Sequence, residues 1–240
     1  MSQSSSSETK EQFVHSVFES IAPKYDMMND LLSFRRHKAW RKFTMAKMNM
    51  SPGDRALDLC CGTCDWTISM AEASGGPIVG LDFSEQMLEY GRRKVKERHL
   101  DSSITLIQGN AMELPFEDNK FDYATIGFGL RNVPDLRQVL REMQRVVKPG
   151  GKVVCLELSK PTWQPFKGIY YFYFQKIMPL LGKMIAKSYE QYKWLPDSLT
   201  MFLGREELKE AFRKAGLGQV EAYPLTGGIA ALHIGIKESS

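Results

Sequence analysis

The chain has 240 residues, 43% of them hydrophobic, which is enough to bury one sizeable core with a helical appendage. Its formal net charge is only +4, from 32 basic and 28 acidic residues dispersed along the sequence. A dedicated nucleic-acid binder would gather its basic residues on one face, so no nucleic-acid partner is expected.

The first twelve residues, 1–12, are polar, rich in serine and without an apolar segment. This composition predicts a disordered lead-in and not a signal peptide, so the protein is expected in the cytoplasm. Thiols are kept reduced in that compartment. The four cysteines therefore indicate no disulfide framework.

Helical patterns fill residues 13–50, in VHSVFESIAPKYD and NDLLSFRRHKAWRKFTMAKM, up to the turn MSPGD. From Arg55 onward, short apolar runs bounded by Gly, Pro and Ser alternate with amphipathic segments. The expected strands are ALDLC, PIVGLD, ITLIQGN, FDYATIG and KVVCLEL. Alternation of this kind predicts a doubly wound, mainly parallel α/β sheet that binds its ligand at the carboxyl ends of the strands.

Residues 160–203 interrupt the alternation with a segment rich in aromatic residues and methionine. Lys167, Lys176, Pro179, Gly182 and Lys183 break its apolar run, so it is too short to span a bilayer. We expect a helical insertion that lines the acceptor site or dips into lipid headgroups. A buried cap over the sheet or a homodimer face remains an alternative. A last helix and two strands complete a single domain over 13–240.

The stretch LDLCCGTCDW holds three of the four cysteines and a Cys-x-x-Cys, from Cys61 to Cys64. A structural zinc site needs four ligands, and neither Cys155 nor the scattered histidines provide a second pair, so no metal is expected. A thioredoxin-type dithiol normally has Gly-Pro or a similar pair between its cysteines, whereas Gly-Thr stands here.

A cofactor loop explains the same stretch better. Asp58 ends a predicted strand, Gly62 lies in the turn to the next helix, and Asp82 ends the following strand. A carboxylate at that point suits ribose hydroxyls. The pattern Asp58-x-Cys60-x-Gly62-x-Cys64 overlays the D-x-G-x-G-x-G of class I S-adenosylmethionine-dependent methyltransferases, with cysteine at two glycines. The alternative is an ordinary strand-turn-helix unit packed around small residues. In the cofactor-loop interpretation, replacing Cys61 with Ser should leave activity largely intact.

Three further segments resemble the ubiquinone and menaquinone biosynthesis C-methyltransferase family. They are YDMMNDLLSFRRHKAW (Tyr25 to Trp40), FGLRNVPD (Phe128 to Asp135) and RVVKPGGKVVCLELS (Arg145 to Ser159). The resemblance extends from about Val14 to the last strands, and GTCD in place of GTGD is its main departure. It implies a class I methyltransferase fold in which residues 13–50 form a lid.

The resemblance also implies methyl transfer from S-adenosylmethionine to a ring carbon of a polyprenylated quinol, without a metal. The stretch CCGTCDW and the short chain resemble menaquinone proteins of Gram-positive bacteria, which favours demethylmenaquinol as the acceptor. A lipid-borne substrate would bring peripheral contact with the membrane. The alternatives are a ubiquinone-branch enzyme, a small-molecule O- or N-methyltransferase, and a non-enzymatic S-adenosylmethionine-binding regulator.

Cofactor contacts are expected at the ends of the first three strands. The resemblance implies that Thr63 and Gly62 form the loop, Asp82 binds the ribose, and Asn110 with Ala111 borders the adenine. Two further residues keep alternative interpretations. Asp58 orders the loop through backbone amides or meets the cofactor's amino group, or it is a turn former at the strand end. Phe83 stacks beside the adenine or belongs to the core.

Arg131 is the candidate to stabilise a developing phenolate, because its planar cation stays charged at every relevant pH. Its alternative role is a surface salt bridge. Asn132 is expected to hold the same loop, and Tyr25 lies on the predicted lid, where a capped helix end is the alternative. His37 is the candidate base, although Arg35 and Arg36 beside it would lower its pKa and a structural role remains open.

Overall fold

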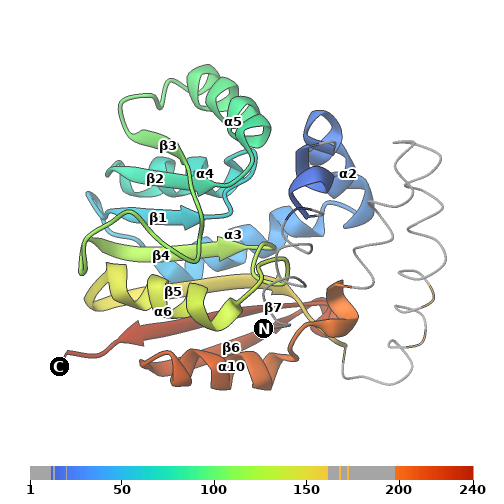
Figure 1. The fold of residues 1–240 in the computed structure, drawn as a ribbon, viewed down its shortest axis with the longest axis vertical. Coiled ribbons are helices and arrows are strands. Elements are labelled where there is room, and N and C mark those ends of the chain that lie inside the picture. Colours follow the sequence, from blue (N-terminus) through green and yellow to red (C-terminus); the bar gives the residue numbers. More distant parts are fainter. Residues whose placement is uncertain are drawn as a thin grey trace.

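The computed structural model describes residues 14–19, 21–161 and 198–239, together with residues 12, 168 and 172. Seven strands form one sheet in the order β3-β2-β1-β4-β5-β7-β6 (Figure 1). The strands are β1 (Ala56–Leu59), β2 (Ile78–Asp82), β3 (Ile104–Gln108), β4 (Phe121–Gly127), β5 (Val147–Leu158), β6 (Leu217–Leu225) and β7 (Ala230–Lys237). The prediction of a doubly wound, mainly parallel sheet is confirmed.

The strands β1 to β5 pair in parallel, whereas β7 lies antiparallel between β5 and β6. The central strand β1 is buried at all four positions, which is why its sequence ALDL is nearly continuous in apolar character. Sequence order and spatial order differ because β1 lies between β2 and β4, and the strand order reverses there. An open parallel sheet binds its ligands at such a reversal, outside the carboxyl ends of the strands.

Helices cover both faces of the sheet (Figure 1). On one face, α6 (Leu136–Val146) and α10 (Arg205–Lys214) contribute Leu140, Met143 and Phe212 to a core with β1, β4 and β5. On the other face lie α3 (Arg36–Met48), α4 (Asp65–Ser74) and α5 (Glu85–Glu97), whose core includes Trp40 and Leu88. Each amphipathic helix therefore buries its apolar stripe against the sheet.

Local signals define the helix ends. The side chain of Ser84 accepts a hydrogen bond from the backbone N–H of Met87 and so caps α5. Asp135 caps α6 in the same way, through the N–H groups of Arg137 and Gln138. Gly75 ends α4 with a left-handed backbone, φ +62°. The caps at Ser84 and Asp135 lie on strand-to-helix loops at the carboxyl edge of the sheet, whereas Gly75 lies on a helix-to-strand loop at the opposite edge.

Residues 13–50, expected as one lid, divide between two positions. The helical residues 14–19, η1 (Ala22–Lys24) and α2 (Tyr25–Leu32) lie beyond the ends of the strands (Figure 1). Helix α3 instead packs on β5, where Trp40 and Met48 are buried and the Trp40 indole donates to Thr226 Oγ1 at 2.8 Å. The α3 part of the segment is thus a layer of the core.

The expected insertion at 160–203 lies mostly outside the described residues. Residues 198–201, at its end, are helical and lead to α10. The short 3-10 helix η3 (Thr226–Gly228) joins β6 to β7 at the predicted Gly-Gly turn. No helix within the described ranges has the length and apolar character needed to cross a bilayer.

Candidate active site

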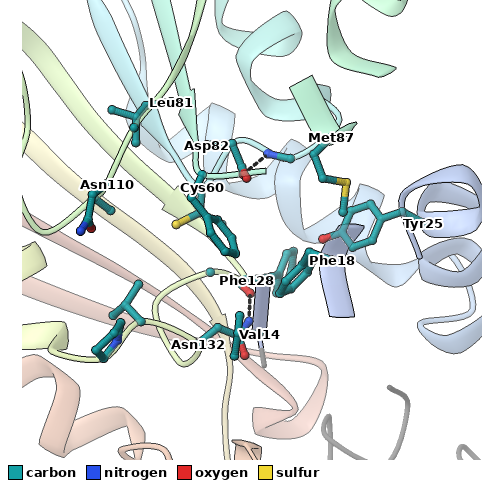
Figure 2. A pocket seen from close by; sticks show the side chains of 18 residues that line it. Val14, Phe18, Tyr25, Cys60, Leu81, Asp82, Met87, Asn110, Phe128 and Asn132 are labelled. Atoms are coloured by element: carbon teal, nitrogen blue, oxygen red, sulfur yellow. Dashed lines mark hydrogen bonds between the residues drawn. The ribbon is translucent and has the colours of Figure 1, made fainter. Parts of the chain in front are cut away.

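A pocket opens at the carboxyl ends of β1, β2, β3 and β4, and we call it the strand-end pocket. Figure 2 shows Tyr25 and Phe18 on one side of it, Asn110 and Leu81 on the other, and Asp82 between them. Its lining is Val14, Phe18, Tyr25, Cys60, Gly62, Leu81, Asp82, Phe83, Met87, Gly109, Asn110, Ala111, Gly127, Phe128, Gly129, Asn132, Val133 and Pro134. Apolar walls with a few polar groups are typical of a small-molecule site.

The loop after β1 has a left-handed backbone at three alternating positions. The φ angles are +52° at Cys60, +54° at Gly62 and +66° at Cys64. Glycine adopts such angles without steric cost, whereas a side chain at these positions strains the backbone. The cysteines therefore occupy positions at which the D-x-G-x-G-x-G pattern has glycine for a conformational reason.

Glycines on the facing elements make room for these cysteine side chains. A Cβ on Gly91 of α5 would collide with Sγ of Cys64, and one on Gly129 would collide with Cβ of Cys60. The added volume of each cysteine is thus matched by a missing side chain opposite. Close packing of this kind allows one loop to hold two cysteines without opening the strand-end pocket.

The thiols of Cys60 and Cys61 are protonated in the folded loop. All four cysteines are free, and the Sγ atoms of Cys61 and Cys64 lie 3.9 Å apart. Burial raises the pKa values of Cys60 and Cys61 well above their ordinary value, so neither is a thiolate near neutrality. Thiol–disulfide exchange needs a thiolate, so neither of these two cysteines is prepared for it. The side chains of the Cys-x-x-Cys pack within the loop, where both are buried.

Asp82 is the charged group of the strand-end pocket. It is 5% exposed, and its Oδ2 accepts from the backbone N–H of Gly62 at 2.8 Å while Oδ1 accepts from Ser84 at 2.9 Å. Burial raises the pKa of Asp82 to about 6, against the lowering effect of these backbone donors. The carboxyl group links two of the loops that form the pocket and retains lone pairs for ligand hydroxyls.

Three more of the predicted cofactor residues line the strand-end pocket. Asn110 and Ala111 follow β3, and Oδ1 of Asn110 accepts from the N–H of Met112 at 2.9 Å, which fixes the amide. Phe83 is in edge-to-face contact with His15, with ring centroids 5.1 Å apart. Its ring therefore joins the end of β2 to the N-terminal helical residues.

Asp58 and Thr63 lie outside the pocket lining. Asp58 is 1% exposed and accepts from the hydroxyls of Thr67 and Thr125, at 2.7 and 2.8 Å. These are side-chain donors from α4 and β4, where backbone amides were one expectation. Burial raises the pKa of Asp58 to about 6, although both hydroxyls oppose this. Asp58 in β1 thus ties helix α4 to strand β4 at the centre of the sheet.

Thr63 connects the loop to the predicted lid. Its hydroxyl donates to Oδ1 of Asp26 in α2 at 2.6 Å and accepts from Nζ of Lys94 in α5 at 3.2 Å. Through these contacts the loop is coupled to the position of α2.

On the acceptor side, Tyr25 and Asn132 both line the strand-end pocket. Burial raises the pKa of Tyr25 above its ordinary value of 10.0, against the lowering effects of a hydrogen bond to Asn29 and of the Arg131 charge. The phenol is therefore protonated at neutral pH and can donate a hydrogen bond into the pocket. Nδ2 of Asn132 donates to the carbonyl of Phe128 at 3.5 Å, within the loop that follows β4.

Arg131 forms a buried ion pair directly behind the pocket wall. Its Nη1 lies 2.6 Å from Oε1 of Glu157, and the two side chains are 5% and 1% exposed. The same nitrogen donates to the carbonyl of Phe128 at 2.5 Å. The ion pair of Arg131 therefore lies in the interior of the protein, whereas the alternative role considered for this residue was a surface salt bridge. Nε of Arg131 is buried without a hydrogen-bond partner among the described residues, a rare condition for a charged donor.

His37 lies outside the strand-end pocket. It lines a second cavity, the charged hollow, whose lining is Asp26, Asp30, His37, Lys38, Arg41, Asp65, Ile68, Ser69, Glu72, Lys94, Glu97 and Arg98. The His37 Nδ1 contacts Ser33 Oγ at 2.6 Å. Burial, and then the charge of Arg41, lower its pKa, whereas the sequence had indicated Arg35 and Arg36 as the causes.

The charged hollow joins the N-terminal helices to the core through a chain of ion pairs. Lys94 of α5 contacts both Asp26 of α2, at 2.9 Å, and Asp65 of α4. Asp65 also pairs with Arg41 of α3 at 3.0 Å. Burial alone would raise the pKa of Asp65, but the charges and hydrogen bonds of Arg41 and Lys94 lower it overall.

A sequence profile of the ubiE/COQ5 methyltransferase family matches residues 6–237. The chain belongs to this family. The demethylmenaquinone methyltransferase of Bacillus cereus is 59% identical over 235 residues, which cover 97% of this chain and 99% of that protein. The family resemblance read from the three sequence segments is confirmed.

Two solved structures share the fold of this ubiE/COQ5 family member. An S-adenosylmethionine-dependent methyltransferase from Aquifex aeolicus gives a TM-score of 0.66 at 16% identity, covering 91% of this chain and 98% of that one. Phosphoethanolamine N-methyltransferase 2 of Haemonchus contortus, solved with S-adenosyl-L-methionine, gives a TM-score of 0.62 at 18% identity. The match covers 83% of this chain and 52% of that one. The predicted class I methyltransferase fold is thereby confirmed.

Sequence reasoning missed several residues that form the pocket of this family member. Val14 and Phe18 enter from the N-terminal helical residues, Met87 from α5, and Phe128 from the end of β4. Phe128 had a signal, since it opens the segment FGLRNVPD directly after a strand. The others are apolar residues on amphipathic helices, and nothing in their sequence separates a pocket wall from an ordinary core position.

Proposed function

We propose that this ubiE/COQ5 family member transfers a methyl group from S-adenosylmethionine to a ring carbon of demethylmenaquinol. The observation that carries the proposal is the 59% identity, over nearly the full length of both chains, with a demethylmenaquinone methyltransferase. The fold alone would not select an acceptor, because one fold hosts many reactions.

The chemistry of the strand-end pocket fits S-adenosylmethionine. The buried carboxyl group of Asp82 suits ribose hydroxyls, Asn110 and Ala111 suit the edge of the adenine, and Gly62 lets a ligand approach the loop closely. Leu81 and Met87 supply apolar surface for the base. When bound there, the cofactor supplies an electrophilic methyl group attached to a positively charged sulfur.

The acceptor carbon becomes nucleophilic when the neighbouring hydroxyl of the hydroquinol is ionised. We assign the electrostatic stabilisation of this oxygen to the Arg131 guanidinium, whose charge acts on the pocket from behind its wall, as it does on Tyr25. Glu157 neutralises part of the guanidinium charge and fixes its orientation. The protonated hydroxyl of Tyr25 and the amide of Asn132 would orient the ring.

Methylation replaces a ring C–H bond by a C–C bond, so a proton must leave the ring after the methyl group has transferred. His37 lines the charged hollow and not the strand-end pocket, and its pKa is lowered. Water therefore accepts this proton, and His37 has a structural role beside Ser33.

The acceptor carries a polyprenyl tail and resides in the bilayer, so the enzyme must meet it at the membrane surface. We propose peripheral association as the way in which this chain reaches its acceptor.

The test is to incubate the protein with S-adenosylmethionine carrying a labelled methyl group and with chemically reduced demethylmenaquinone. Label should enter the quinone fraction, and mass spectrometry should place it on the naphthoquinone ring. Reduced demethylated benzoquinone of the ubiquinone branch serves as the comparison acceptor. Label found only in that benzoquinol, or on oxygen in place of ring carbon, would overturn the proposal.

A further inference from the structure

Three large apolar side chains stand exposed along one face of α2 and the turn after it. The exposed fractions are 51% for Met27, 38% for Leu31 and 70% for Phe34. A spacing of four residues places Met27 and Leu31 on one face of α2, while Met28 and Leu32 are buried, and Phe34 follows in the turn after the helix. Single exposed apolar residues are ordinary, but a cluster of them rimmed by polar residues marks an interaction surface.

The backbone under this cluster is strained. Phe34 and Arg35, in the turn between α2 and α3, have φ angles of +48° and +60°. Glycine or asparagine would adopt this left-handed region more readily than phenylalanine does. An exposed aromatic side chain at an unfavourable backbone position indicates that the side chain itself is used.

Three basic residues flank this cluster in the sequence, one before its apolar side chains and two after them. Lys24, Arg35 and Arg36 are exposed and flank the apolar side chains at both ends of α2. Apolar side chains rimmed by cations fit a bilayer with anionic lipid, since the headgroups attract the cations and the acyl boundary accepts the apolar groups.

We propose that this α2 surface, formed by Lys24, Met27, Leu31, Phe34, Arg35 and Arg36, docks on the anionic surface of a lipid bilayer. The inference rests on the proposed function, because a polyprenylated acceptor has to be collected from the bilayer. Helix α2 lies beyond the carboxyl ends of the strands (Figure 1), and its first residue, Tyr25, lines the strand-end pocket. Docking through α2 therefore brings one wall of the pocket to the lipid surface.

The test measures co-sedimentation with vesicles of phosphatidylglycerol and phosphatidylcholine in equal parts, and with phosphatidylcholine alone. The parent should bind the anionic vesicles and bind the neutral ones far more weakly. Phe34→Gly should lower the affinity by about tenfold or more, because one buried aromatic side chain is lost. Its melting temperature should stay equal or rise, because glycine relieves the left-handed backbone. Phe34→Trp should retain binding.

The charge contribution has its own pair of variants. Lys24→Gln combined with Arg36→Gln should weaken binding by about fivefold for each charge removed. Arg213→Gln combined with Lys214→Gln removes the same charge from α10 and should bind as the parent does. Equal binding by all variants would overturn the proposal. So would a Phe34→Gly variant that binds vesicles normally but changes oligomeric state on size exclusion, because the surface would then join copies of the chain.

Failure of this inference and failure of the proposed function are distinguishable. In detergent, with a short-chain demethylmenaquinone as acceptor, Phe34→Gly should methylate as fast as the parent. A parent that methylates this acceptor but does not bind anionic vesicles would overturn only the docking surface. A parent that methylates no naphthoquinol would overturn the proposed function, whatever the vesicles show.

Discussion

Helix α2 contributes residues to two cavities, one mostly apolar and one lined by charged side chains. Tyr25 lines the strand-end pocket, whose walls are mostly apolar, while its neighbour Asp26 lines the charged hollow. In the pocket, burial raises the pKa of Asp82 to about 6. In the hollow, Arg41 and Lys94 overcome the effect of burial and lower the pKa of Asp65. The same residue type thus has a raised pKa in one cavity, where burial dominates, and a lowered pKa in the other, where ion pairs join the helices.

The largest expected effect concerns the pocket side. Asp82→Ala removes both the ligand-facing carboxyl group and the anchor of the Gly62 loop. Affinity for S-adenosylmethionine, measured by calorimetry, should fall by about 100-fold or more, because hydrogen bonds to a charged group contribute about 1.5–3 kcal/mol each. Asp101→Ala, an exposed carboxylate elsewhere, should bind normally. Normal binding by Asp82→Ala would show that the pocket is not the cofactor site.

Arg131→Ala tests whether the buried ion pair serves catalysis or only stability. The variant leaves Glu157 charged and unpaired, which should cost about 3–5 kcal/mol of unfolding free energy. Turnover should fall, while affinity for S-adenosylmethionine stays close to that of the parent.

The double variant Arg131→Met with Glu157→Leu separates the two roles of the pair. It should recover most of the stability, because no buried charge remains, but not the turnover. Recovery of turnover in that double variant would assign the pair to structure alone.

A pair of pH measurements tests the contrast between buried and paired carboxyl groups. The pKa of Asp58 is raised in the folded protein, so ionising its carboxyl group opposes folding. The protonated carboxyl group therefore contributes its full stabilisation of the fold below pH 3.8, and this stabilisation is lost as the pH rises through about 6. Asp58→Asn should therefore gain stability relative to the parent between pH 4 and pH 7, by at most about 3 kcal/mol. Asp65→Asn should instead lose stability relative to the parent. The pKa of Asp65 is lowered in the folded protein, so its ionised carboxylate stabilises the fold at pH values above its ordinary pKa of 3.8. Denaturant melts at both pH values measure this, and equal signs would refute the contrast.

The smallest expected effect lies in the charged hollow. Lys94→Met breaks the contacts from α5 to Asp26 and Asp65, and should lower the unfolding free energy by about 1 kcal/mol at low salt. Added salt should reduce this loss, because screening already weakens the pairs in the parent. Lys96→Met, an exposed lysine on the same helix, is the control. A loss that does not depend on salt would indicate packing by the lysine stem instead.

Part of the pocket lining followed from local pattern. Gly62 and Asp82 were predicted from the turn residues and the strand ends, whereas Asn110 and Ala111 were implied by the family resemblance, and all four line the strand-end pocket. The segment 13–50 was harder to interpret. A helical pattern does not show which surface a helix packs against. In the structure, α3 packs on the sheet through Trp40, whereas α2 lies at the pocket, which Tyr25 lines.

The sequence by itself determined the order of strands and helices, the position of the loop after β1 and the family, because these depend on periodicity, turn residues and short motifs near one another in the chain. Tertiary structure alone decided the partners of the charged groups. Arg131 meets Glu157, Thr63 meets Asp26, and His37 faces the charged hollow. These contacts join residues up to 37 positions apart, and burial and charge set the pKa of each group only after the chain has folded.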